Sequence, residues 1–518
     1  MQYALKGICE TDIPDIPIAA VVRTTTPLYP VMDQLYFDVA AYFVPDRVTW
    51  KHFKQFWGEN DLTFWEQPVE YEIPQIEAPA TGWAAKSIAD YLGVPTGVSG
   101  ISVSHMPFRA YCKIWSDYYR DENLKEPAFY NDDDTTLTGI VYDPLTYDYT
   151  TDTNLGAKLL KVAKLSDYFT KCLPEPQKGP DVALPLGELA PVGAGTTDWT
   201  SNADFKHQLN FNNIDGTART TDNVLALTNE GGTGGVIRPL TNTITPGTEG
   251  SMVYPTNLYA DLSNALGATI NELRTAIALQ RYYEAIARSG SRYVEILAGI
   301  FGVESSDKTQ QRAQFIGGKR FPLNMSQVVA TAEGSNNDLG ETGAMSQTVI
   351  NDWIGQFAAE EHGTLMIVGC VRCERTYTQG IPKMLLRKKN TDMYNRAFDH
   401  LGEENVTNEQ IYAQGTSQDK ETFGYQPRYE DMRLGISMVS GEFRGNYATS
   451  LDSWTYQDEY NQLPTLSSEW IDETVENVDR TLKVASTVAD QIFGDFFFNM
   501  KWTRGMSMYG TPGFMDHM

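Results

Sequence analysis

Hydrophobic and polar residues alternate in two stretches near opposite ends of the chain. From Asp33 to Val44, one side of the alternation consists of Leu35, Phe37, Val39, Ala41 and Phe43. Near the other end, one side consists of Phe496, Phe498, Met500 and Trp502. A period of two residues places alternate side chains on opposite faces of a strand. Both stretches are therefore predicted to be strands with one buried face, and Pro45 is expected to end the first.

Two shorter patterns predict one more strand and a short helix. The segment from Thr364 to Arg375 begins as a nearly continuous apolar run and then becomes polar, as in a core strand that emerges at a surface. After Pro45, aromatic residues recur near the spacing of a helical turn, which predicts a short amphipathic helix carrying Trp50, Phe53, Phe56 and Trp57.

The clearest helix is expected to start at Thr269. Thr269 and Glu272 have the spacing of a capping box, in which each side chain bonds the backbone amide of the other residue. An apolar helical stripe then comprises Ala276, Leu279, Tyr283 and Ile286. Ser289-Gly290-Ser291 interrupts it before a second apolar piece, so we expect two helices or one bent helix.

The segment 193–250 differs in composition from the rest of the chain. Gly, Thr and Asn make up 28 of its 58 residues, and only nine are charged. It has too few large apolar residues for a core of its own. Thr-rich strands that pack against copies of themselves are the preferred interpretation.

Composition limits the class of protein. A chain of 518 residues would ordinarily form two or more domains. The net charge of −26, from 67 acidic and 41 basic residues, argues against a surface uniformly adapted to nucleic acid. The 25 prolines, 42 glycines and 12% aromatic residues are typical of strands joined by long loops.

The cysteines and apolar runs indicate neither secretion nor membrane insertion. Five scattered cysteines indicate no disulfide framework, and Cys370 and Cys373 are interpreted as packed thiols of one strand rather than a zinc or redox site. No signal peptide and no apolar stretch of eighteen residues is found.

Candidate chemistry is weak. Gly231–Gly235 lacks the Lys of a phosphate loop, Asp132–Asp134 lacks the spacing of a calcium loop, and the six histidines form no catalytic motif. We therefore predict no enzyme, no cofactor and no metal. The cluster Arg387, Lys388 and Lys389 is either a solvated turn or a contact for DNA phosphates, with aromatic residues nearby for base stacking.

The segment Met106–Leu124 mixes five aromatic residues with six charged ones. Its composition alone favours a partly buried helix. It is also one of ten stretches that together resemble the major capsid protein of the Microviridae, most closely its gokushovirus branch. These stretches are Pro27–Asp33 leading into Tyr42–Arg47, Met106–Tyr111, Leu184–Gly187, Thr269–Arg274, Ser291–Ile296, Glu361–Gly363, Gln379–Met384, Phe423–Tyr429, Val478–Arg480 and Tyr509–His517.

The resemblance implies a mainly β fold, an eight-stranded antiparallel viral jelly roll of two facing sheets. It makes residues 1–518 one domain whose long, partly helical insertions account for the length. Sixty copies would form a T=1 icosahedral shell around a circular single-stranded DNA genome, with trimer and pentamer contacts. The chain would thus reside in the virion, and in the host cytoplasm during assembly.

The resemblance also implies partners and contact residues. The 193–250 insertion would form a surface protrusion at the threefold axes that contacts a host receptor, with Trp199, Phe211, Gly232 and Gly234 as candidate residues. A small basic virion protein would help to condense the DNA, because the subunit itself is acidic. Candidate subunit-interface anchors are Phe108, Arg109, Tyr111, Trp115, Tyr118, Tyr119 and Arg120. Trp115→Ala is expected to reduce shell yield more than folding, unless the rings face the core.

Two departures from the family pattern and one alternative function are noted. Only 26 residues precede Pro27, where relatives carry a longer arm, so contacts made by that arm are in doubt. The closing segment has Trp502 where relatives usually have Cys near that position. The alternative is a jelly roll that binds or processes carbohydrate, which would have a defined pocket and form no shell.

Overall fold

A computed structural model describes residues 5–505 except 9–11, 60–69, 181, 183–191, 195–210, 214–224, 229–235, 240–252, 256–257, 261–269, 291, 332, 334–338 and 341. The contacts divide the chain into two units. The first comprises residues 1–178 and 284–518, and the second comprises residues 179–283. The segment 193–250 that composition sets apart falls within the second unit.

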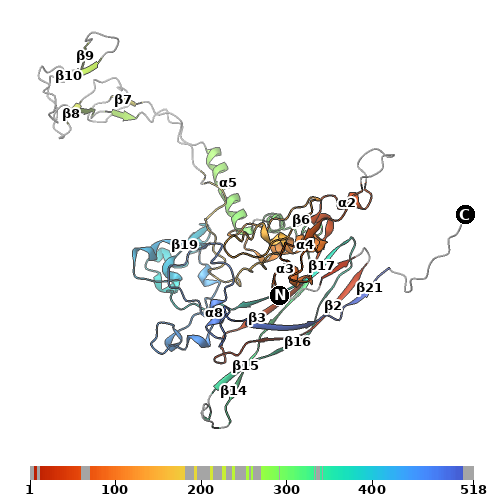
Figure 1. Ribbon diagram of the computed structural model, residues 1–518. Coiled ribbons are helices and arrows are strands. Elements are labelled where there is room, and N and C mark those ends of the chain that lie inside the picture. Colours follow the sequence, from red (N-terminus) through yellow and green to blue (C-terminus); the bar gives the residue numbers. More distant parts are fainter. Residues whose placement is uncertain are drawn as a thin grey trace, which may run out of the picture. The chain divides into compact units, whose positions relative to one another are not determined.

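The first unit is built around two antiparallel sheets (Figure 1). One has the strand order β1-β17-β3-β13, with bounds Leu5–Ile8, Gly363–Cys373, Leu35–Pro45 and Gln314–Pro322. The other has the order β16-β2-β20, and β21 also pairs with β2; its bounds are Thr348–Gln356, Ile13–Thr24, Ile492–Phe497 and Lys501–Thr503. The fold is mainly β, as predicted.

The two sheets enclose the main hydrophobic core. Strand β2 alternates strictly, and its buried residues include Ile16, Ile18, Ala20 and Val22. Strand β3 contributes Leu35, Phe37, Val39, Ala41 and Phe43, which are the five residues that the alternation assigned to one face. Because the apolar side chains of both sheets meet in one cluster, the core forms a layer between them.

The opposite face of β3 and β17 is covered by the inserted segments. Tyr42, Val44, Met366 and Val368 pack there against residues of α3 (Ile88–Tyr91) and α4 (Met106–Ile114), and Figure 1 shows these helices beside the sheet. Strand β17 is therefore buried on both faces at its start. This explains why its sequence is continuously apolar where one-sided strands alternate.

Short 3-10 helices lie among the remaining α-helices and strands that are described in the first unit, and these α-helices and strands are short as well. They are α1 (Asp46–Thr49), α2 (Phe53–Phe56), β4 (Gln75–Glu77), β5 (Ser102–Ser104), β6 (Leu137–Thr138), α6 (Tyr293–Phe301), β14 (Met325–Val329), β15 (Thr342–Ser346), α7 (Lys383–Leu386), β18 (Glu403–Thr407), β19 (Thr422–Pro427) and α8 (Glu476–Asp479). A smaller core lies beside β18 and β19 and contains Phe169, Tyr377 and Val406.

The second unit carries short paired strands. These are β7 (Val192–Ala194) with β12 (Leu258–Ala260), β8 (Phe211–Asn213) with β11 (Val253–Pro255), and β9 (Leu225–Thr228) with β10 (Val236–Pro239). The long helix α5 (Ile270–Ser289) begins in this unit and ends in the first.

The predicted elements are largely confirmed, with shifted ends. Strand β3 includes Pro45 instead of ending before it, and the predicted C-terminal strand is two strands, β20 and β21. The aromatic helix after Pro45 is one turn, α2. The break at Gly290, which has a φ of +110°, separates α5 from α6 as expected, whereas the proposed cap residue Thr269 lies outside the described residues.

The thiols of Cys370 and Cys373 are buried in β17, and burial raises the pKa of both. For Cys370 the pKa is about 12. A protonated, enclosed thiol is neither a nucleophile nor a metal ligand. The interpretation as packed strand thiols is confirmed.

Candidate functional site

The segment Met106–Leu124 forms α4, which has Pro107 in its first turn, followed by one π-helical turn at Trp115–Tyr119. Proline suits the first turn because the amide that it lacks would have no partner there. Phe108, Tyr111 and Trp115 are each at most 2% exposed and belong to the cluster that covers β3 and β17. These rings therefore face the core of their own subunit.

Arg109 is a fully buried cation in the same helix. Its guanidinium donates to Nδ1 of His105 and to the backbone oxygens of Thr49 and Asp133. His105 Nε2 lies 2.9 Å from the carbonyl oxygen of Asn154. Burial lowers the pKa of His105 to about 4 and also lowers the pKa of Arg109. Arg109 thus joins α4 to two loops, and His105 stays neutral so that Nδ1 can accept.

The remaining polar atoms of the segment also bond within the chain. Trp115 Nε1 donates to the carbonyl oxygen of Lys161, and the Tyr118 hydroxyl donates to that of Ala313. The Tyr119 hydroxyl bonds that of Tyr42 on β3. Arg120 is half-buried and donates to two backbone carbonyls.

These contacts bear on the proposed interface anchors. Phe108, Arg109, Tyr111 and Trp115 have almost no surface left to offer a neighbouring subunit, because their own chain already encloses them. Tyr118, Tyr119 and Arg120 keep partial exposure. Sequence reasoning left open whether these aromatics face the core or a neighbour, since either role needs large side chains.

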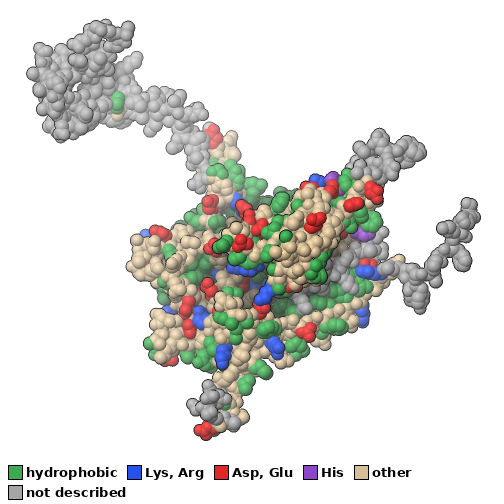
Figure 2. All heavy atoms as spheres, viewed as in Figure 1, with side chains coloured by type: hydrophobic (Ala, Val, Ile, Leu, Met, Phe, Trp, Pro, Cys, Tyr) green, Lys and Arg blue, Asp and Glu red, His purple; other side chains and the backbone are tan. Residues whose placement is uncertain are grey.

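The basic cluster after α7 is only partly available to a ligand. Arg387 is held by Asp431, with both carboxylate oxygens within hydrogen-bond distance of one guanidinium nitrogen. Lys388 and Lys389 have exposed side chains, and their backbone amides bond Asp392. On the face shown in Figure 2, Lys and Arg side chains lie scattered among acidic ones. Lys388 and Lys389 are therefore the exposed cations of this turn, and the Asp392 carboxylate lies beside them.

Of the candidate host-contact residues, Phe211 begins strand β8, which pairs with β11. Trp199, Gly232 and Gly234 lie outside the described residues. The structure thus places one of the four on a paired strand of the second unit.

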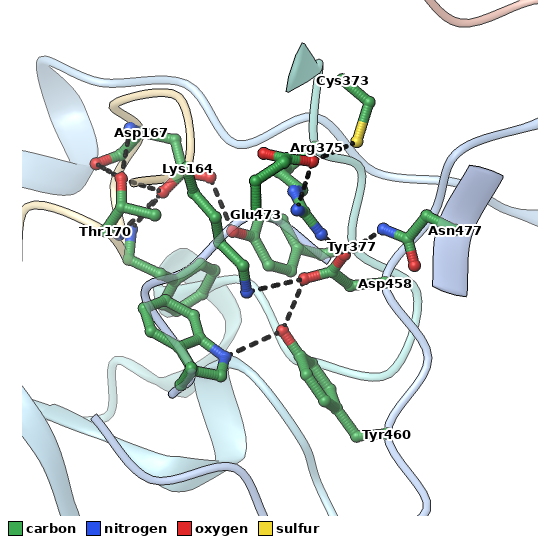
Figure 3. A network of polar contacts seen from close by, with 12 residues as sticks. Lys164, Asp167, Thr170, Cys373, Arg375, Tyr377, Asp458, Tyr460, Glu473 and Asn477 are labelled. Carbon is green, nitrogen blue, oxygen red and sulfur yellow. Dashed lines mark hydrogen bonds and ion pairs between the residues drawn. The ribbon is translucent and has the colours of Figure 1, made fainter. Parts of the chain in front are cut away.

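Sequence reasoning missed a buried ionic network where β17 leaves its sheet (Figure 3). Arg375 bonds Asp458 and, at 2.7 Å, Glu473. Lys164 lies 3.7 Å from the second carboxylate oxygen of Asp458 and stacks over the ring of Trp470. The Asp458 carboxylate and both cations have side chains at most 4% exposed.

The charges of this network stabilise one another. Burial alone would raise the pKa of Asp458, but Arg375, Lys164 and a hydrogen bond from Asn477 hold it below its ordinary value. Its members come from residues 164–170, 373–377 and 458–477, three segments far apart in sequence. The network is thus a polar joint between the inserted loops and the end of β17. In the sequence, the only sign of this network is that charged residues occur within loops rich in aromatic residues.

The described residues contain neither a candidate metal site nor a candidate membrane-spanning helix. Among them, no three His, Cys, Asp or Glu side chains converge as a metal site would require. Asp134 of the acidic triplet accepts from Trp50 Nε1 and bonds His52 instead. No helix within the described part has the length and apolar composition needed to cross a membrane.

Two antiparallel sheets around one core, with helical and looped insertions, define a mainly β protein. Residues 8–514 match the family model of the capsid protein (F protein), so the chain belongs to this phage capsid family. The resemblance to the Microviridae major capsid proteins is thereby confirmed.

Curated relatives of similar length agree with this assignment. The chain is 36% identical over 503 residues to capsid protein VP1 of Spiroplasma virus 4, which covers 96% of this chain and 88% of the relative. It is 34% identical to capsid protein VP1 of Bdellovibrio phage phiMH2K and 32% identical to that of Chlamydia phage 1, with 95% of this chain covered in each case.

Proposed function

We propose that sixty copies of this chain assemble into a T=1 icosahedral shell that encloses a circular single-stranded DNA genome. The observation that carries the proposal is the family match over residues 8–514, which covers almost the whole chain. Closed point-group assembly of identical subunits is the ordinary way for one chain to build a shell. Its place is the virion, after assembly in the host cytoplasm, and its role is structural rather than enzymatic.

The fold supports a jelly-roll subunit. Two antiparallel sheets face one another across a single core, and each is made of strands from both halves of the chain. Antiparallel sandwiches of this kind are the usual body of viral capsid subunits. The long insertions lie between β3 and β13 and between β17 and β20, so they lengthen the chain without interrupting the sheets.

The charge of the chain supports a second partner for the genome. A subunit with a net charge of −26 cannot neutralise DNA over its whole surface. We therefore assign local DNA contact to turns such as Lys388 and Lys389, and bulk neutralisation to a small basic virion protein. If shells made from this chain alone package single-stranded DNA to normal density, the basic partner is not needed.

The second unit supports a role in attachment to a host-cell surface receptor. Residues 179–283 form contacts mainly among themselves, and the predicted protrusion 193–250 lies within them. Exposed loops carried by a rigid scaffold are the usual carriers of recognition. Replacing 193–250 with the corresponding segment of a relative should change adsorption to host cells while shells still form.

Negative-stain microscopy of the purified chain tests the proposed function directly. Closed particles of one size are the expected result. Monomers or small oligomers under all assembly conditions, together with binding to a carbohydrate array, would favour the alternative of a carbohydrate-binding jelly roll.

A further inference from the structure

Two segments that are far apart in the sequence meet where β3 leaves its sheet. Residues 46–57, which contain α1 and α2, follow β3 directly, and residues 361–364 span the start of β17. Pro45 and Gly363 pair at this end of the sheet. A Cβ added to Gly363 would lie 2.5 Å from the carbonyl oxygen of Val44, so this close approach of the two strands requires glycine.

Three polar contacts join these two segments, and together we call them the clasp. The Asp46 amide donates to the carbonyl oxygen of His362 over 3.2 Å. The Asp46 carboxylate accepts from the hydroxyl of Thr364 over 3.3 Å. Arg47 forms an ion pair with Glu361. Two of the three contacts therefore depend on Asp46.

The Asp46 carboxylate is partly buried and bonds a hydroxyl instead of a cation. Arg47, the next residue in the chain, is directed to Glu361 and Gln311. Burial raises the pKa of Asp46 to about 6; the Thr364 hydroxyl lowers it in part, and the like charge of Glu361 raises it. The ionised form of Asp46 is therefore poorly stabilised where it lies.

The other charged and titratable groups around α1 and α2 bond elsewhere. Arg109 of α4 donates to the carbonyl oxygen of Thr49 at the end of α1. The other contacts are those of His52 with Asp134, Lys54 with Glu59, Lys308 with Glu360, Lys51 near Asp133, and the His362 ring stacked on that of Trp57. Among these described groups, none supplies a cation to the Asp46 carboxylate.

We propose that Asp46 is a proton-dependent switch that sets how firmly residues 46–57 are attached to the start of β17. In its neutral form, the carboxyl group bonds Thr364 without repelling Glu361. When it loses its proton, a second negative charge appears beside Glu361 in a partly buried site. The clasp then loosens, because opening it exposes this charge to water. The switch does not depend on shell formation, since all its parts belong to one subunit.

The direction of the pH effect follows from linkage between protonation and folding. Folding raises the pKa of Asp46 from 3.8 to about 6. The contribution of Asp46 to the clasp is therefore complete below the unfolded value and is lost as the pH rises through the folded value. Mild acid tightens the clasp, and neutral solution loosens it. Folded His105, whose pKa is about 4, is still neutral at about pH 5, so the two groups can be separated there.

Hydrogen exchange of the whole chain tests the switch at the Trp50 amide, which donates to the carbonyl oxygen of Asp46 over 2.9 Å. The variant Asp46→Asn keeps the shape of the side chain but cannot ionise. At about pH 7.5 the Trp50 amide should exchange roughly tenfold more slowly in this variant than in the wild type, and at about pH 5 the two rates should agree within about twofold. The control is Asp352→Asn on β16, whose carboxylate lies 3.6 Å from Lys319 and outside the clasp.

Three results would overturn the inference. They are a ratio of the two exchange rates that is the same at both pH values, an equal effect in the control, and an equal effect at the amides of β2. The third means that the change acts on the stability of the whole subunit. If Asp46→Asn does not fold, the wild type decides alone. Its protection factor at Trp50 should then fall between about pH 5 and about pH 7.5 while those of β2 do not, and a constant value at Trp50 contradicts the switch.

Discussion

The composition of the α4 segment allows its residues either to pack in the core or to contact another subunit. The burial of single residues distinguishes between these two roles. Trp115 and Tyr111 have the side chains of interface anchors, yet both lie in the core beside β3 and β17. The buried Arg109 pairs with neutral His105 and with carbonyl oxygens rather than with a partner subunit. The segment therefore fixes the inserted layer to the sheet.

Trp115→Ala is expected to destabilise the subunit itself. Removing a fully enclosed indole leaves a cavity and orphans the carbonyl oxygen of Lys161, at a cost of about 3–5 kcal/mol. Urea denaturation of the unassembled subunit measures the loss. The matched control is Leu145→Ala, at a side chain that is 92% exposed, where stability should barely change. Full subunit stability with a loss of shells alone would restore Trp115 as an interface anchor.

His105 should make the subunit sensitive to mild acid. Its pKa falls from 6.5 to about 4 on folding, mainly through burial. A group whose pKa is lowered by folding stabilises the fold above its unfolded pKa, and this contribution is lost as the pH falls toward the folded value. Roughly 3 kcal/mol should thus disappear between pH 6.5 and pH 4.

Denaturation curves at several pH values across this range test the prediction for His105. The variant His105→Gln cannot titrate, so its stability should decline less steeply with acidification than that of the wild type. Equal slopes for the two proteins would show that His105 is not the group responsible.

At the scale of elements, alternation predicts strands well but not their interruptions. The inward side of β3 and the faces of Phe496 and Trp502 follow directly from a period of two. The break between β20 and β21 cannot be predicted from that pattern, because it depends on which residues of β2 pair with each of the two strands. Helix α2 is shorter than the spacing of the aromatic residues predicts. That spacing indicates which rings lie close together, but it does not indicate which backbone groups are hydrogen-bonded.

The buried network of Figure 3 was not predicted for a related reason. Arg375, Asp458 and Lys164 lie up to 294 residues apart, and each alone resembles a solvated surface charge. Only the packing of three loops brings them together. The candidate DNA turn shows the same limit, because nothing local in the sequence indicates that Asp431 neutralises Arg387.

Asp458→Asn should loosen the joint between the loops and β17. The change leaves Arg375 and Lys164 buried without their shared carboxylate, which costs about 3–5 kcal/mol. Because folding lowers the pKa of Asp458, its contribution is present above the unfolded value of 3.8 and lost as the pH falls through the folded value.

Thermal denaturation at neutral pH and in acid measures both effects of Asp458→Asn. The matched control is Asp490→Asn, which removes the partner of Lys86 from an ion pair that is largely exposed, and should change little. An Asp458→Asn subunit as stable as this control would mean that the network is not a joint.

At the scale of the whole molecule, the subunit combines a rigid sandwich with segments that leave surface uncovered. The two sheets enclose a hydrophobic core, whereas α6 exposes the apolar side chains of Tyr293 and Phe301. Family and fold class could be predicted from ordered motifs, but the exposure of α6 could be known only from the packing.

The mass of the assembled particle tests the central claim most directly. Sixty subunits of 57.9 kDa amount to about 3.5 MDa of protein. Sedimentation analysis of particles purified after expression of this chain should show one dominant species whose protein mass has that value. A population that stays at the mass of monomers, dimers or trimers under every assembly condition would contradict the account.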